Sequence, residues 1–190
     1  RRGAYDPGVV GRLGFGMVLA FALLGCGPSG VTPPDVTPDP TTASMTQGRF
    51  VLDFTIDRTT LRPRDPVTGL ARLSLLGPAG ATVSGAGSLF GFEFFEIGGE
   101  MRHVVPLFDA SCAPHRITAN GPLESPLLVT GSIPQGDPNA KWYREFLAAK
   151  DINLPTGEWD ISIAMSFFDG QGCTGQHVDL RASVRVHVIE

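Results

Sequence analysis

Apolar and polar side chains alternate along much of the chain after residue 48, and this alternation predicts β-strands. In residues 50–56 the side chains at even-numbered positions are Phe50, Leu52, Phe54 and Ile56, with Val, Asp and Thr between them. A period of two with one apolar face is typical of a half-buried strand. The pattern recurs in residues 158–167 and most regularly in 178–188. Further strands are expected at residues 71–75, 81–83, 89–97, 100–108 and 127–133.

Residues 137–150 follow a helical period instead. Asp137 stands in an N-cap position and Pro138 in the first helical position, which are favoured places for these residue types. Trp142 and Phe146 then share one stripe, so we expect a helix of about three turns that covers an open end of the sheets.

The strands and the frequent Gly and Pro turn signals together predict an all-β fold. We expect an antiparallel Ig-like β-sandwich of about 7–9 strands with one short helix, formed by residues 49–190. Residues 60–68 and 154–159 resemble strand entries of Ig-like modules in bacterial envelope proteins, and the sandwich is also similar to small inhibitor-like domains. These resemblances imply a fold and no activity.

An uncharged apolar run at residues 13–24 follows Arg1, Arg2 and Arg12. A basic segment before an apolar run of this length is typical of a secretory signal peptide. Twelve helical residues rise about 18 Å. A bilayer core is about 30 Å thick, so the run is too short to span it comfortably.

The run ends in Leu23-Leu24-Gly25-Cys26, which resembles the lipobox of bacterial lipoproteins. The resemblance implies removal of residues 1–25 and attachment of diacylglycerol to the Cys26 thiol. Acyl chains would then hold the protein on a membrane. Gly27 favours the outer membrane over the inner one in a cell that has both. The alternative is an ordinary secretory signal in which Cys26 has no special role.

Residues 26–48 are rich in Pro and Thr and predict a disordered tether. Without residues 1–25, which hold three Arg and one Asp, the chain keeps 12 basic and 18 acidic side chains. This acidic balance argues against a nucleic-acid partner.

Two cysteines remain beyond Cys26, and an exported chain favours a disulfide between Cys112 and Cys173. The alternative is a metal site formed by Cys112, His115, Cys173 and His177. With a disulfide we expect no metal and no cofactor.

Common catalytic motifs are missing from the sequence, so we expect no enzyme. The favoured function is a non-catalytic binding or scaffolding domain that is lipid-anchored in the bacterial cell envelope, with a protein or envelope component as partner. Residues 89–97 are expected to fill the core, with Phe92 and Phe95 as an alternative partner-binding aromatic patch. A second alternative is a protease inhibitor that uses the loop at residues 58–69, and a third is a periplasmic metal-binding protein.

Overall fold

A computed structural model describes residues 40–133 and 135–190. The predicted signal peptide, Cys26 and most of the predicted tether lie outside the described residues. The elements are β1 (Thr41–Gln47), β2 (Phe50–Ile56), β3 (Thr60–Leu61), β4 (Gly69–Leu75), β5 (Ala81–Gly85), β6 (Gly91–Ile97), β7 (His103–Val104), β8 (Ala113–Ile117), β9 (Leu123–Pro126), α1 (Ala140–Ala148), β10 (Gly157–Asp169) and β11 (Gln176–Val188).

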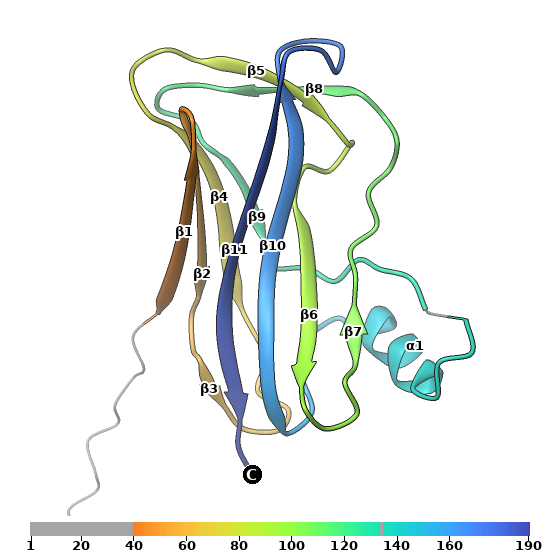
Figure 1. The fold of residues 1–190 in the computed structure, drawn as a ribbon. Coiled ribbons are helices and arrows are strands. Elements are labelled where there is room, and N and C mark those ends of the chain that lie inside the picture. Colours follow the sequence, from red (N-terminus) through yellow and green to blue (C-terminus); the bar gives the residue numbers. More distant parts are fainter. Residues whose placement is uncertain (1–39, 134) are drawn as a thin grey trace, which may run out of the picture. The chain divides into compact units, whose positions relative to one another are not determined.

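The strands form the two sheets of an all-β sandwich, as the alternation predicts (Figure 1). One sheet has the order β1-β2-β4-β9. The other has the order β3-β11-β10, after which β10 pairs with β5 along one stretch and with β6 along another. All these pairs are antiparallel except the short one between β3 and β11. The described strands number eleven, slightly more than expected, because β1, β3, β8 and β9 lie where no strand was predicted.

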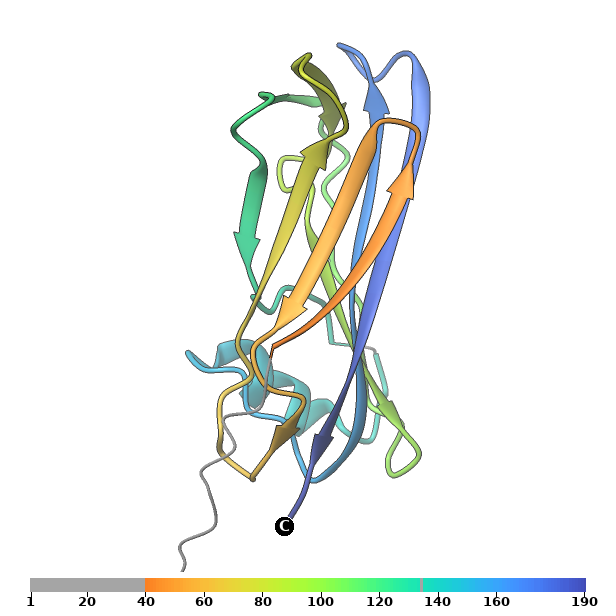
Figure 2. The ribbon, with the colours of Figure 1, turned by 90° about the vertical axis from the view of Figure 1, so that its left-hand side faces the viewer.

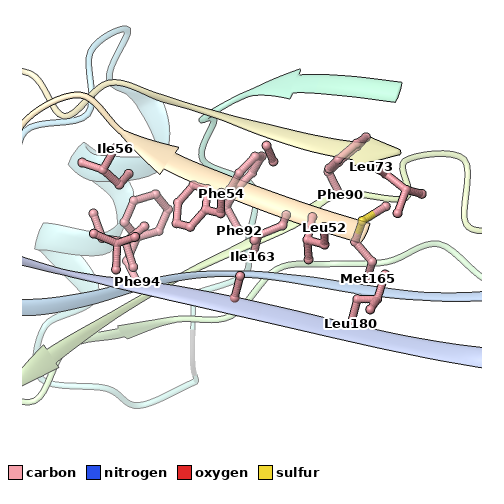
Figure 3. Packing of buried hydrophobic residues seen from close by; sticks show 14 of the residues in the cluster. Leu52, Phe54, Ile56, Leu73, Phe90, Phe92, Phe94, Ile163, Met165 and Leu180 are labelled. Atoms are coloured by element: carbon pink, nitrogen blue, oxygen red, sulfur yellow. The ribbon is translucent and has the colours of Figure 1, made fainter. Parts of the chain in front are cut away.

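The core lies between the sheets and is built from the apolar faces that the period of two predicts. Phe54 of β2 meets Phe92 of β6 with ring centroids 6.0 Å apart, and Phe50 meets Phe167 of β10 at 5.0 Å. Figure 3 shows side chains of β2 directed toward those of β6 and β10. Burial of each such aromatic side chain contributes roughly 2–3 kcal/mol to folding.

The hairpin of β10 and β11 is the longest pairing in the fold and carries the site described below. Thirteen residue pairs join the two strands, from Gly157 opposite Val188 to Asp169 opposite Gln176. In β11, the even-numbered side chains from Val178 to Val188 are buried and the odd-numbered ones are exposed. The outer face of this hairpin is therefore mainly polar, with Ala164 and Phe168 of β10 as its apolar members.

The predicted boundary between the tether and the domain is wrong, because β1 lies within the predicted tether. Residues 41–47 were expected to be disordered, but all seven pair with β2 and run beside β11 (Figure 2). The Gln47 side-chain oxygen also accepts a hydrogen bond from the backbone N–H of Asp179, at 3.0 Å. The strand was missed because nearly all of its side chains are exposed or half-buried, so it has no apolar face to detect. The domain therefore begins before residue 49.

Two predicted strands were wrong or too long. Residues 127–133 are irregular and follow the short strand β9. Leu127, Leu128 and Val129 pack against the core as an extended segment, which explains why they are apolar. The strand expected at residues 100–108 is reduced to β7, after a loop in which Gly98, Gly99 and Met101 have positive φ.

The helix begins three residues after the expected N-cap. Its N-cap is Asn139, without a side-chain cap, and Asp137 instead accepts a hydrogen bond from the Asn139 N–H in a turn before the helix. The expected apolar stripe is confirmed, because Trp142 and Phe146 pack toward the sandwich together with Tyr143.

Candidate functional site

Three side chains on the outer face of the β10–β11 hairpin are connected by one hydrogen bond and one ion-pair contact. The Ser166 Oγ lies 2.9 Å from Nε2 of His177, and Nδ1 of His177 lies 3.0 Å from a carboxylate oxygen of Asp179. The strand register accounts for this arrangement. Ser166 is directly opposite Asp179, while His177 is opposite Phe168, one step diagonally from Ser166. We call Ser166, His177 and Asp179 the serine–histidine–aspartate group.

The histidine of this group is held from two sides. Its ring packs against Phe168 with a centroid distance of 5.0 Å, and the Asp179 carboxylate lies beside Nδ1. A carboxylate beside Nδ1 favours the neutral tautomer that carries its proton there, which leaves Nε2 unprotonated toward its other neighbour. The geometry therefore suits Ser166 as the hydroxyl donor to Nε2. The group is open to solvent, with side-chain exposures of 47% for His177 and 66% for Asp179.

A shallow groove of about 280 Å³ lies beside Ser166. Two exposed apolar side chains, Met45 of β1 and Phe108 of the segment after β7, belong to its lining. Ala164 contributes a small side chain, and the Phe108 ring occupies the space that a side chain at Gly91 would take. The remaining lining residues are Met165, Ser166, Asp179, Leu180 and Arg181.

Next to the groove, Glu93 accepts hydrogen bonds from several donors. Its carboxylate lies 2.5 Å from Nε2 of His103, 3.2 Å from Oγ of Ser162, and in contact with the Arg181 guanidinium. Desolvation by burial acts to raise the pKa of Glu93. The hydrogen bond with His103, the charge of Arg181 and the Ser162 hydroxyl outweigh it, so the pKa of Glu93 lies below its ordinary value. Glu93 is therefore an ionised anchor that fixes Arg181 beside the groove.

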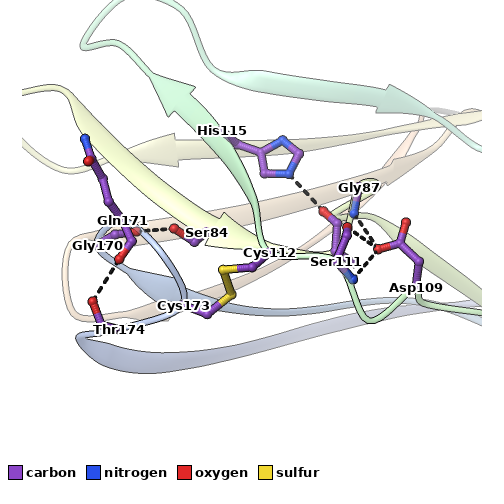
Figure 4. Close-up of a disulfide and its surroundings, with 11 residues drawn as sticks. Ser84, Gly87, Asp109, Ser111, Cys112, His115, Gly170, Gln171, Cys173 and Thr174 are labelled. Atoms are coloured by element: carbon purple, nitrogen blue, oxygen red, sulfur yellow. Dashed lines mark hydrogen bonds between the residues drawn. A yellow bond between two sulfur atoms is a disulfide. The ribbon is translucent and has the colours of Figure 1, made fainter.

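The predicted disulfide between Cys112 and Cys173 is confirmed (Figure 4). It joins the segment that leads into β8 to the loop between β10 and β11. Ser84 holds the same loop by a hydrogen bond of 2.5 Å to the backbone oxygen of Gly170. Cys173 has a φ of 54°, in the left-handed region, within a loop that also contains three glycines of positive φ. The bridge thus braces the turn from which β11 and its His177 begin.

The alternative metal site at Cys112, His115, Cys173 and His177 is contradicted, because the two sulfur atoms are bonded to each other. His115 instead hydrogen-bonds to the backbone oxygen of Ala86, at 2.9 Å. His177 belongs to the serine–histidine–aspartate group. Within residues 40–133 and 135–190, no three side chains of the His, Cys, Asp and Glu types are grouped so that they could hold a metal ion.

Phe92 of the predicted aromatic patch lies in the core, whereas the predicted inhibitor loop keeps an exposed tip. Phe92 is fully buried, and Phe95 packs on the ring of His103 at 5.3 Å. The loop at residues 58–69 is held to the domain by β3 and by the buried Val67, whose N–H donates to the oxygen of Ile152. Its exposed tip consists of residues 62–64.

The sequence analysis missed Ser166, Asp179 and the groove residues Phe108 and Arg181. The available signal was the His177-x-Asp179 pair on the outward face of a regular strand. Placing Ser166 next to it required the hairpin register, which depends on the six-residue loop between Asp169 and Gln176. A sequence pattern alone leaves the length of such a loop undetermined by one or two residues.

No family model matches the sequence, and no curated protein is similar to it. In the described part of the chain, the helix is too short and too polar to cross a lipid bilayer.

Proposed function

We propose that this protein is a lipid-anchored component of the bacterial cell envelope, which displays a β-sandwich that binds a protein or envelope component. The observation that carries the proposal is the Cys112–Cys173 disulfide. Disulfides persist mainly in oxidising compartments outside the cytoplasm. The bridge therefore agrees with export, which the basic and apolar residues before Cys26 imply independently.

The position of β1 supports attachment through the amino-terminal segment. β1 starts at the end of the sandwich where β11 finishes, and the disulfide-braced loop lies at the opposite end (Figure 1). An anchor at Cys26 would connect to the domain at the end where β11 finishes. The hairpin loop would then be at the end of the domain farther from the point of attachment.

The groove beside Ser166 is the surface that we assign to the partner. It combines two exposed apolar side chains, Met45 and Phe108, with the charged Asp179 and Arg181. Apolar anchors bordered by polar groups are common in binding surfaces. The acidic balance of the mature chain disfavours nucleic acid and anionic lipid headgroups as occupants.

The anchor is tested by intact mass spectrometry of the protein expressed in a bacterium with its own signal. We expect a chain that begins at Cys26, carries acyl groups, and gains two hydrogens on reduction. A Cys26→Ser variant should lose the acyl groups and leave the membrane fraction. A wild-type mass without acyl groups would contradict the lipoprotein proposal and leave an ordinary secreted domain.

A further inference from the structure

We propose that Ser166 is an activated nucleophile and that the domain cleaves small apolar esters through the serine–histidine–aspartate group. The inference rests on the proposed function in that it uses the groove assigned to the partner and names an ester as the chemical group bound there, but it does not depend on the lipid anchor. It rests on two observations that lie side by side. One is the pair of contacts that connect Ser166, His177 and Asp179, a hydrogen bond of 2.9 Å from Ser166 to His177 and an ion-pair contact of 3.0 Å from His177 to Asp179. The other is the mainly apolar groove, which Ser166 and Asp179 both line.

The order of the contacts assigns a role to each side chain. Ser166 donates its hydroxyl hydrogen to Nε2 of His177, which makes His177 the general base. The Asp179 carboxylate lies 3.0 Å from Nδ1, where its negative charge favours a proton on that nitrogen and stabilises the imidazolium once it forms. Phe168 packs on the imidazole and limits its rotation. Asp179 is therefore a positioning residue for His177.

The groove indicates the class of substrate. A volume of about 280 Å³ with Phe108, Met45 and Ala164 in its lining fits a short acyl chain. Arg181 is the one cationic side chain among the lining residues, and Glu93 and Ser162 hold its guanidinium. These contacts direct the guanidinium toward Ser162, four residues along β10 from Ser166, so Arg181 borders the groove and is not part of the reacting centre. These features together favour an uncharged ester with a short acyl group.

The proposed reaction has two steps. In the first, the Ser166 oxygen bonds to the ester carbonyl carbon and its proton moves to Nε2 of His177. The bond to the alkoxy leaving group then breaks, and His177 returns the proton to that group as an alcohol is released. In the second step water gives a proton to Nε2 of His177 and its oxygen bonds to the acyl carbon. The bond from that carbon to the Ser166 oxygen then breaks, His177 returns the proton to the Ser166 oxygen, and the carboxylic acid is released. Neither step requires a cofactor or a redox partner.

The first experiment treats the purified full-length chain in detergent with a fluorophosphonate probe and locates the label by peptide mass spectrometry. We expect the label on Ser166. Ser183→Ala is the matched control, since Ser183 is an exposed serine on the same face of β11. Ser166→Ala should abolish labelling, while Ser183→Ala should leave it unchanged. Labelling that is absent, or that persists in Ser166→Ala, would overturn the proposal.

Hydrolysis of p-nitrophenyl acetate and butyrate supplies a second readout. We expect Ser166→Ala and His177→Gln each to lower kcat by about 100-fold or more. Asp179→Asn should lower kcat by less and alter the pH profile, because it changes the tautomer preference of His177. Phe108→Ala should raise KM for butyrate more than for acetate. Equal rates for Ser166→Ala and Ser183→Ala would refute catalysis without touching the anchor proposal, which the acyl mass at Cys26 tests separately.

Discussion

At the scale of single residues, Glu93 shows how a charge can be kept on a sheet face with little exposure. Its side chain is 13% exposed, and three donors surround its carboxylate. An enclosed carboxylate is stable only where donors compensate for lost water. The two oxygens therefore bind His103, Ser162 and Arg181 into one unit that joins β6, β7, β10 and β11.

Glu93→Gln is expected to lower the free energy of unfolding at neutral pH by about 1–3 kcal/mol, because hydrogen bonds to a charged group are lost. Glu93 has a lowered pKa in the folded state. Its contribution is therefore fully present above its ordinary pKa of 4.5 and lost as the pH falls through the folded value. Urea unfolding as a function of pH should accordingly show a smaller loss of stability on acidification in the variant than in wild type.

Glu124→Gln provides the comparison for this measurement. Glu124 pairs with Arg72 on the four-stranded sheet, but both side chains are well exposed. Such exposed pairs contribute at most about 1 kcal/mol. An effect of Glu93→Gln no larger than that of Glu124→Gln would show that the Glu93 interactions add little stability.

At the scale of elements, α1 is attached to the sandwich by a stack of aromatic rings. Trp142 stacks on Phe146 at 4.8 Å and lies 5.9 Å from Trp159 of β10. The Tyr143 hydroxyl accepts a hydrogen bond of 2.8 Å from the backbone N–H of His103, which fixes β7 to the helix. The Arg102 guanidinium packs over the Trp142 ring at 5.2 Å. The helix thus covers one end of the sandwich and positions the chain that leads to Phe108.

Trp142→Ala should destabilise the domain by about 3 kcal/mol, the usual cost of removing a large aromatic side chain from a packed site. The loss should be accompanied by a decrease in helical circular dichroism, because a helix this short depends on tertiary packing. Lys141→Ala is the control, since the Lys141–Glu145 pair is exposed and contributes only a few tenths of a kcal/mol. Similar unfolding midpoints for the two variants would contradict this role of the aromatic stack.

The elements that the sequence revealed are those with one buried face. β2, β10 and β11 were predicted because their alternation continues for at least seven residues and their inward side chains are all apolar. β1 was not predicted because its own side chains show no apolar alternation. It is a strand because it pairs with β2. Residues 127–133 were misread because apolar residues that pack in an irregular segment look like a short strand. The serine–histidine–aspartate group could not be predicted, because it depends on the pairing register of β10 and β11, which local sequence patterns do not contain.

At the scale of the whole domain, the disulfide is the covalent link between segments 61 residues apart in sequence. A loop of that length restricts the unfolded chain strongly, and the chain-entropy model gives a stabilisation of about 4 kcal/mol. The bridge also braces the loop that leads to His177. Its removal should therefore affect both the stability of the domain and the chemistry of the hairpin face.

A Cys112→Ser and Cys173→Ser double variant is expected to unfold at a lower urea concentration than wild type, and reductant should shift the wild type to the same midpoint. Fluorophosphonate labelling of Ser166 should decrease in parallel, because His177 loses its fixed backbone. The double variant itself should not respond to reductant, which makes it the internal control. An unchanged midpoint would mean that the bridge contributes no net stability.

The entry of the chain through β1 has a mechanical consequence. A pull on residue 41 directed away from the domain acts along the axis of β1, toward the end where the strand begins. All the hydrogen bonds between β1 and β2 then bear the load together in shear, as does the link from Gln47 to β11. Peeling from the other end would break the same bonds one after another at much lower force. If the protein is attached through this segment and binds a partner at its far end, tension between the two acts along β1. This is the direction in which β1 resists removal from the sheet best.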